Sequence, residues 1–398
     1  MRDSTGTTQV TLKKGSTPPE LFETLERTPR ESVIEAEGEV KLSTKTQRGL
    51  ELVPHSIHVV TQAEVPLPLG VVDKVGAELS TRLDHRVLDL RKPAVRSVFE
   101  LRAALLDGFR QAFIHRGFLE VETPKVLAQG AEGGATLFPV DYFERRAYLA
   151  QSPQLYKQML MGAGFDRVFE IGPAFRAEPS DTVRHITEFT SLDAEVAYIR
   201  EPDELRSLLE QIVAEALDLT RTRLEENKNP LAGNVPKAEL PFPRVPFSTC
   251  EEWLGRPGGG TDFGADDEKR IAGIVERDLA KPFYFITDFP AAAKAQTFYA
   301  RRRDDDPTRT MYFDLYCRDL ELASGGPREH RLNRLLANMR SAGLDPALFE
   351  AYLEAFRFGM PTHGGWGFGV DRFVQAVAQL PNIRESRLFP RDRYRLEP

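Results

Sequence analysis

The sequence predicts an α+β fold, in which an antiparallel six-stranded sheet is flanked by helices and preceded by a smaller, partial β domain. Two observations support this prediction. Six apolar segments after residue 140 have strand-like composition, and no regular crossover helix separates them, which favours antiparallel pairing. Residues 1–66, in contrast, contain short segments in which apolar and polar residues alternate, as in half-buried strands.

The N-terminal strands are predicted at residues 7–12, 32–42 and 50–60, and a helix is expected between the first two, at residues 19–26. Three strands are too few to close an OB-type barrel, which needs five. Residues 1–66 are therefore expected to be the back portion of such a barrel.

Residues 67–93 are predicted to form a hinge, and residues 94–398 a second, larger domain that opens with a long amphipathic helix from Ala94. A short strand is expected at residues 118–124, stopped by a proline. The six main strands are predicted at residues 146–151, 167–177, 191–199, 283–290, 310–324 and 364–370. Further helices are predicted at residues 203–226, 327–341, 345–357 and 369–379, and an ordered loop at residues 227–247.

The composition excludes several classes of protein. No apolar run approaches the roughly 20 residues of a membrane helix, so no membrane partner is expected. The only cysteines are Cys250 and Cys317, which form no disulfide framework, and we expect a cytoplasmic location. The formal net charge is −7, so any nucleic acid would have to be bound by local basic patches.

The chain has neither a GxxxxGK[ST] loop nor a βαβ glycine fingerprint. A nucleotide site in this chain would therefore hold phosphate with guanidinium groups, and several arginines are suitably placed in the sequence. Arg176 ends an apolar strand, where a guanidinium can brace an α-phosphate. Arg184 and His185 lie in a polar turn that would reach the far end of a triphosphate, and Phe189 could stack on adenine. Arg372 begins a helix after the glycine-rich GGWGFGV. Taken singly, an arginine is better explained by a surface ion pair, and Phe189 by core packing.

Two further sets of residues indicate a site for a metal ion and a site for a substrate amino acid. Asp314, Glu321 and Ser324 offer the oxygen ligands that magnesium prefers, although charges on strands also serve solubility. Two cations, Lys157 and Arg328, would suit the carboxylate of a substrate, since burying both without an anion is costly. The residues that could accept hydrogen bonds from an α-ammonium group are Glu132, Gln154 and Asp193.

Together these segments resemble the signature motifs of class II aminoacyl-tRNA synthetases, subclass b, and in particular the archaeal and eukaryotic type of aspartyl-tRNA synthetase. GFLEVETPK (117–125) resembles motif 1, FRAEPSDTVRHITEF (175–189) resembles motif 2, and GFGVDR (367–372) resembles motif 3. The resemblance extends over residues 2–398, with several unrelated motifs in the right order.

This resemblance implies an aspartate–tRNA ligase that activates L-aspartate with ATP and Mg²⁺ and transfers it to tRNA(Asp), and that forms a homodimer through motif 1. Whether tRNA(Asn) is also charged stays open, and Gln47 lies in the loop that bears on this choice in the family. The alternatives are an asparaginyl-tRNA synthetase, or a paralogue that makes aspartyl-adenylate for a non-tRNA acceptor or acts as an RNA-binding regulator.

The resemblance also assigns roles by position. It implies an ATP site made of Arg176, Ala177, Glu178, Arg184, His185, Ile186, Phe189, Glu321, Gly369, Val370, Asp371 and Arg372, with Arg176 and Arg372 as the catalytic cations. It implies an aspartate site made of Glu132, Gln154, Lys157, Arg176, Asp193, Ser324 and Arg328, and magnesium ligands Asp314, Glu321 and Ser324.

The sequence departs from the family pattern in three places. Members of the family have a complete OB barrel, whereas the first two strands and part of a third are not matched here, so anticodon reading is in doubt. Asp371 stands where the family usually has glutamate, and Pro179 and Ser180 are unusual in the turn that would face ATP.

Overall fold

The structure is a computed structural model that describes the chain except for residues 4, 5, 16, 47, 48, 73–75, 131–136, 180, 181, 259 and 261. The chain forms two compact units, Met1–Ala77 and Glu78–Pro398. The predicted hinge, residues 67–93, extends across this boundary. Its second half folds as helices α2 (Leu79–Asp84) and α3 (Arg86–Asp89) of the larger unit.

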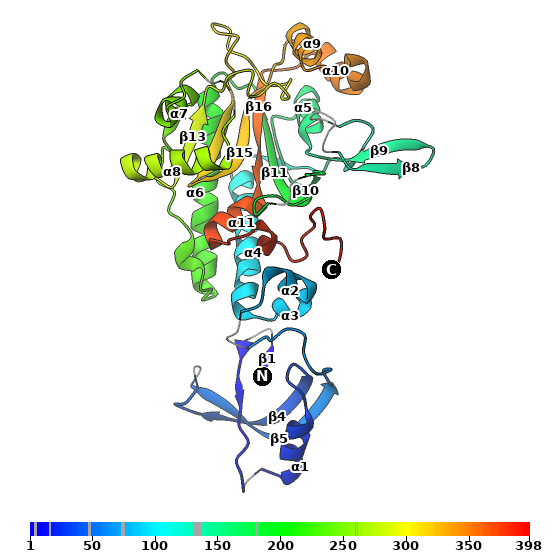
Figure 1. The fold of residues 1–398 in the computed structure, drawn as a ribbon, viewed down its shortest axis with the longest axis vertical. Helices are drawn as coiled ribbons and strands as arrows, with labels where there is room; N and C mark the ends of the chain where they lie inside the picture. The colour runs from blue at the N-terminus through cyan, green and yellow to red at the C-terminus, as the bar shows by residue number, and fades with distance from the viewer. Residues whose placement is uncertain are drawn as a thin grey trace. The chain divides into compact units, whose positions relative to one another are not determined.

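The first unit contains the predicted helix and the strands predicted at residues 32–42 and 50–60, whereas the segment 7–12 is divided between two short strands of different sheets (Figure 1). Its elements are β1 (Arg2–Asp3), β2 (Gly6–Thr7), β3 (Gln9–Val10), α1 (Pro19–Arg27), β4 (Val33–Leu42) and β5 (Leu50–Thr61). Strands β4 and β5 pair antiparallel, and β3 pairs parallel with β5. At a register shift in β4, a Cβ atom on Gly38 would come 2.2 Å from the carbonyl oxygen of Val53, so this bulge requires glycine.

The second unit is built on an eight-stranded sheet, in the order β12-β13-β14-β15-β16-β11-β10-β6. Its strands are β6 (Leu119–Glu120), β10 (Arg167–Phe175), β11 (Glu188–Ala197), β12 (Arg244–Pro246), β13 (Phe283–Thr287), β14 (Phe313–Cys317), β15 (Leu320–Pro327) and β16 (His363–Gly369). The six central strands pair antiparallel, whereas the two edge strands, β6 and β12, pair parallel with their neighbours.

The predicted count of six strands was therefore wrong for the whole sheet, for identifiable reasons. Strand β12 spans only three residues, too few for an alternating pattern to be recognised. Strand β6 lies within the short strand predicted at residues 118–124, which was not counted as part of the sheet. The segment 310–324 folds as two strands, because the chain turns at Arg318, whose φ is +55°. The segment 146–151 belongs to another sheet, formed by β7 (Val126–Leu127), β8 (Pro139–Tyr142) and β9 (Arg145–Leu149).

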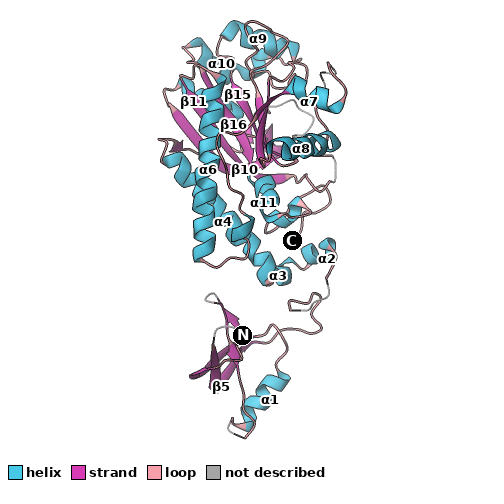
Figure 2. Ribbon diagram, turned by 90° about the vertical axis from the view of Figure 1, so that its left-hand side faces the viewer, coloured by secondary structure: helices cyan, strands magenta, loops and turns pink. Residues whose placement is uncertain are grey.

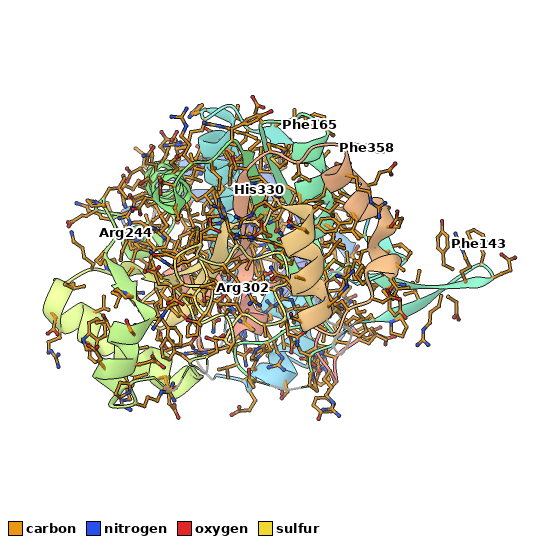
Figure 3. The ribbon with its side chains drawn as sticks, turned by 90° about the horizontal axis from the view of Figure 1, so that it is seen from above. Phe143, Phe165, Arg244, Arg302, His330 and Phe358 are labelled. Atoms are coloured by element: carbon orange, nitrogen blue, oxygen red, sulfur yellow. The ribbon has the colours of Figure 1, made fainter. Side chains whose placement is uncertain are left out.

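The hairpin of β8 and β9 extends away from the main sheet (Figure 1), and its turn carries Phe143. Figure 3 shows this side chain at the far end of the hairpin, and it is 84% exposed. The sequence pattern alone did not distinguish this hairpin from a strand of the central sheet.

Helices α4 (Pro93–Ile114) and α6 (Pro202–Glu226) lie side by side against one face of the main sheet (Figure 2). The remaining helices are α5 (Gln154–Gly162), η2 (Ala232–Asn234), α7 (Phe247–Leu254), α8 (Ala265–Leu279), α9 (Leu332–Ser341), η3 (Pro346–Phe349), α10 (Glu350–Arg357), α11 (Val370–Ala378) and η4 (Ile383–Ser386). Helices α5, α7 and α8 were not predicted. In the part of the chain that the structure describes, no helix combines the length and the apolar character of a membrane span.

Alternation along the strands decides which residues face these helices. Phe169, Leu192, Ala194, Trp366 and Phe368 point into the core formed with α4 and α6. On the opposite face, α5, α9 and α10 form one apolar cluster, and α7 and α8 form another. Strands β11, β15 and β16 lie between these two groups of helices (Figure 1), and their polar side chains face the functional site described below.

Candidate active site

A cavity of about 340 Å³ opens over β11, β15 and β16. Its floor contains Asp193 on β11 and Ser324 on β15, both of which lie opposite Gly367 of the strand between them. A Cβ atom on Gly367 would come 3.2 Å from the Asp193 Oδ1 atom, and one on Gly365 would come 2.3 Å from Glu195 Oε2. The glycines of β16 thus leave room for the carboxylates of β11, which gives GGWGFG a structural reason.

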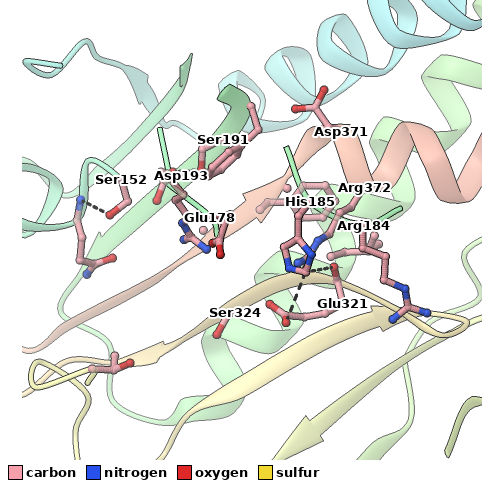
Figure 4. Close-up of a pocket in the computed structure, with 18 of the residues that line it drawn as sticks. Ser152, Glu178, Arg184, His185, Ser191, Asp193, Glu321, Ser324, Asp371 and Arg372 are labelled. Atoms are coloured by element: carbon pink, nitrogen blue, oxygen red, sulfur yellow. Dashed lines mark hydrogen bonds and ion pairs between the residues drawn. The ribbon is translucent and has the colours of Figure 1, made fainter. Parts of the chain in front are cut away.

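The predicted guanidinium groups of Arg176 and Arg372 both line this cavity. Arg176 follows β10, and its guanidinium lies 5.3 Å from the ring centroid of Phe189 on the paired strand β11. Arg372 lies in the first turn of α11, where its Nη1 atom is 3.6 Å from Glu321 Oε2 and donates to the Glu321 carbonyl oxygen. Figure 4 shows Arg372 and Glu321 facing each other, with Arg184 to one side and Asp193 toward the other. Three segments far apart in the sequence therefore share one cavity.

Arg184 lines the same cavity but is held by two carboxylates. Its guanidinium donates to Glu268 on α8 and to Asp319 in the turn between β14 and β15, both at 2.7 Å. Burial lowers the pKa of the neighbouring His185, and Arg372 lowers it further. Burial, together with the charge of Glu321, raises the pKa of the Glu268 carboxyl. A polyanion at this end of the cavity would therefore compete with Glu268 and Asp319 for the Arg184 guanidinium.

A lysine that the sequence analysis did not select lies on the β14–β15 side. The Lys294 Nζ atom is 2.8 Å from Asp314 Oδ2. Asp314 Oδ1 accepts a hydrogen bond from Ser324 Oγ at 2.5 Å. Burial raises the pKa of the Asp314 carboxyl to about 6 against the opposing charge of Lys294, and the charge of Glu321 raises it too. Lys294 lies in a loop without a recognisable motif, so only the folded chain reveals its position.

The two cations predicted for the substrate carboxylate lie directly behind the cavity lining and are fully buried. The Lys157 Nζ atom contacts Asp193 Oδ1 at 2.9 Å and Glu195 Oε2 at 3.6 Å, and donates to the Trp366 carbonyl oxygen. Arg328 donates to both oxygens of Glu195, at 3.0 and 3.2 Å, and to the Tyr312 hydroxyl at 2.6 Å. Burial opposes the charge of Arg328, but Glu195 raises its pKa above the usual value.

Gln154, at the start of α5, lines the cavity close to these charges. Its Nε2 atom is buried and has no hydrogen-bond partner among the residues that the structure describes. An orphaned buried donor costs free energy unless a ligand satisfies it, so this amide is a candidate binding group.

The cavity gathers most, but not all, of the residues predicted for the site. The predicted residues that line it are Gln154, Arg176, Glu178, Arg184, His185, Ile186, Phe189, Asp193, Glu321, Ser324, Gly369, Asp371 and Arg372. Ala177 is not among the lining residues, and Val370 is instead packed in the core with α4. Asp314, Lys157 and Arg328 stand behind the lining, while Glu132 and Gln47 lie outside the described residues.

Asp371 lines the cavity, but its carboxylate is bound by residues of neighbouring elements. Its carboxylate accepts from Arg102 and from the backbone N–H of Thr190, both at 2.7 Å. It therefore joins α4, β11 and α11. The lining residues that the sequence analysis missed are Ser152, Ser191, Lys294, Gln296, Thr297, Tyr299, Tyr312, Leu322, Gly367, Phe368 and Ile383. Ser191 could have been predicted from the sequence, and so could Glu195 behind the lining. Each lies two residues from Asp193 on the same strand, and residues two apart on a strand lie on the same face.

Residues 78–393 match the family of class II tRNA synthetases for D, K and N. That range includes every residue that lines the cavity. The chain belongs to this family.

Among curated relatives of this class II synthetase, the aspartate–tRNA(Asp) ligase of Thermococcus kodakarensis is 43% identical, covering 100% of this chain and 91% of the relative. The aspartate–tRNA(Asp/Asn) ligase of Methanopyrus kandleri is 44% identical with the same coverage.

Solved structures of the family agree with the fold. The asparaginyl-tRNA synthetase of Pyrococcus horikoshii, complexed with asparaginyl-adenylate, has a TM-score of 0.89 and 31% identity, covering 100% of this chain and 91% of that one. The aspartyl-tRNA synthetase of Entamoeba histolytica has a TM-score of 0.85 and 31% identity, with 98% and 84% covered. The class II fold predicted from the motifs is thus confirmed.

Proposed function

We propose that this protein is an aspartate–tRNA ligase, which activates L-aspartate with ATP and transfers the aspartyl group to the 3′ end of tRNA(Asp). The observation that carries the proposal is the division of one cavity into two ends. Arg176 and Arg372 are at one end, while the other end has Asp193 and Gln154 in its lining and the buried cations Lys157 and Arg328 behind it. Full-length relatives with the name aspartate–tRNA ligase support this reading.

At the nucleotide end, Arg176 and Arg372 are the proposed catalytic cations, with Phe189 beneath adenine. In the activation step an oxygen of the substrate α-carboxylate attacks the α-phosphorus, the bond to the bridging oxygen breaks, and pyrophosphate leaves. The attacking carboxylate is already ionised, so no general base is needed. Fixed guanidinium groups stabilise the charge that builds on the phosphate oxygens, and orientation supplies the rest of the rate enhancement.

At the amino-acid end, the proposed ligand of the aspartate side chain is Arg328. Glu195 and Tyr312 account for three of its five N–H groups, which leaves two donors for an incoming carboxylate. Asp193 is the proposed acceptor for the α-ammonium group. Both oxygens of an aspartate side chain can accept from these donors of Arg328, whereas the amide nitrogen of asparagine is itself a donor, which favours aspartate over asparagine.

The donor set fits Mg²⁺, which would neutralise phosphate charge. Glu321 and Ser324 line the cavity and offer hard oxygen donors to the same space, whereas Asp314 lies behind the lining and accepts a hydrogen bond from Ser324. Among the described residues no group of three or more His, Cys, Asp or Glu residues could hold a metal. Mg²⁺ sites commonly use one or two carboxylates and complete the shell with phosphates and water.

The remaining assignments follow from the family. We propose that the Met1–Ala77 unit contacts the anticodon region of tRNA, that the chain acts as a homodimer, and that it works in the cytoplasm. Charging of tRNA(Asn) in addition to tRNA(Asp) is a second candidate activity, favoured by the Methanopyrus kandleri relative named for both.

Aspartate-dependent exchange between ATP and pyrophosphate tests the first step. We expect exchange with L-aspartate and almost none with L-asparagine, and the opposite preference would overturn the amino-acid assignment. Charging of purified tRNA(Asp) and tRNA(Asn) then tests the second step. Exchange without charging of either tRNA would indicate an adenylate-forming paralogue with another acceptor.

A further inference from the structure

Lys294 is positioned as a resident cation of the catalytic cavity. Its side chain is 12% exposed, and its ammonium group lies 4.1 Å from the ring centroid of Phe289. Besides the contact with Asp314 at 2.8 Å, the Nζ atom is 3.8 Å from Asp262 Oδ2. A ring face and two carboxylates therefore hold the charge in place, on the wall that also carries Glu321 and Ser324.

The carboxylate of Asp314 is engaged on both oxygens. Asp314 and Ser324 are paired across β14 and β15, and the serine hydroxyl donates to Oδ1 while the lysine donates to Oδ2. The carboxylate is only 3% exposed. A divalent ion that approached it would meet the full positive charge of Lys294 within a few ångströms, in a setting where water screens poorly.

We propose that Lys294 occupies the position on Asp314 that a divalent cation would otherwise take, and so restricts direct metal binding in this cavity to Glu321 and Ser324. Lys294 is then a positioning residue. It supplies one fixed positive charge beside the phosphates, independent of the magnesium concentration, and it orients Asp314, which in turn orients Ser324. The inference relies on the proposed function only for the choice of Glu321 and Ser324 as metal donors.

The test is direct binding of Mn²⁺, a spectroscopic probe for Mg²⁺, to the full chain without ATP, aspartate or tRNA. Free Mn²⁺ is measured by electron paramagnetic resonance. For Lys294→Met, which keeps apolar contact with Phe289, we expect either one additional Mn²⁺ per chain or at least about tenfold tighter binding, because an unopposed second carboxylate becomes available. Lys294→Arg keeps the charge and should bind Mn²⁺ as the unaltered chain does.

Three further variants complete the test. In Lys294→Met combined with Asp314→Asn the gain should disappear. Asp314→Asn alone should leave Mn²⁺ binding within about twofold, whereas Glu321→Gln should remove it. Lys269→Met makes the same change on an exposed residue of α8 and should have no effect.

Two results would overturn the proposal. One is unchanged Mn²⁺ binding by a folded Lys294→Met chain, and the other is loss of Mn²⁺ binding in Asp314→Asn alone. If Lys294→Met fails to fold, the Asp314→Asn measurement still decides. Because no turnover is involved, these outcomes are independent of the aspartate-dependent exchange assay, so a failure of the proposed function is recognised separately.

Discussion

Arg328 and Glu195 form a bidentate ion pair beneath the cavity, with Nε and Nη2 of the arginine at 3.0 and 3.2 Å from the two carboxylate oxygens. Both side chains are fully buried. The pair links β15 to β11 behind the amino-acid end of the site. Because Lys157 lies 3.6 Å from the same carboxylate, Glu195 compensates two buried cations at once.

Removing the charge of Glu195 should destabilise the second unit. We expect Glu195→Gln to lower the free energy of unfolding by about 3 kcal/mol or more, because Arg328 and Lys157 would remain buried with one carboxylate less. Urea unfolding followed by tryptophan fluorescence measures this unit alone, since the only tryptophans, Trp253 and Trp366, both belong to it.

The matched control is Glu100→Gln. Glu100 pairs with Arg96 at 3.0 Å, but both side chains are more than a third exposed, so the loss should stay below about 1 kcal/mol. Equal losses in the two variants would show that burial does not govern the Glu195 pair.

The role of Arg176 predicts a catalytic defect without a folding defect. Arg176→Ala should reduce aspartate-dependent ATP–pyrophosphate exchange by roughly 10²- to 10³-fold or more, as expected for a fixed donor to developing charge. The unfolding midpoint should be unchanged. Arg200→Ala, an exposed arginine outside the cavity, should retain normal exchange. Exchange at the normal rate in Arg176→Ala would contradict the assignment.

Lys157 should affect the use of aspartate far more than the binding of ATP. We expect Lys157→Ala to raise the KM for aspartate by about tenfold or more, with the KM for ATP within about twofold, because the lysine contacts Asp193 and not the phosphate end. Exchange rates measured against each substrate in turn give both constants. A defect confined to ATP would refute the placement of the amino acid.

His363 predicts a dependence of stability on pH. Burial lowers the pKa of this imidazole to about 4, below the ordinary value of 6.5. Its ring nitrogens face the Pro361 carbonyl oxygen and the Gln158 side chain. Since the unfolded chain binds the proton more readily, the contribution of neutral His363 is fully present above pH 6.5. It is lost as the pH falls toward 4, by up to about 1.4 kcal/mol per pH unit.

Unfolding of the native chain and of His363→Gln at pH 7 and pH 5 measures this contribution. The difference between the two proteins should be larger at pH 7 than at pH 5. An equal difference at both values would mean that His363 titrates normally in the folded chain.

The local pattern of apolar and polar residues predicted many of the strands and helices. Alternation predicted β4 and β5 of the first unit, and apolar spacing predicted α4 and α6, because each signal repeats over many residues. Pattern failed where an element was too short, as in β12 and in the two short strands at residues 6–10. It also failed where pairing was decided elsewhere in the chain, as in the hairpin of β8 and β9.

The types of group in the site can be read from the order of residues along single strands and turns: guanidinium groups for phosphate, carboxylates for an ammonium group or a metal, and glycines in β16. Which charges meet depends on how the strands pair in the folded chain. Lys294 reaches Asp314 and Arg328 reaches Glu195 because β11, β14, β15 and β16 are paired in one register. The strength of a charge interaction depends on distance and burial, and neither quantity is a property of a segment taken alone.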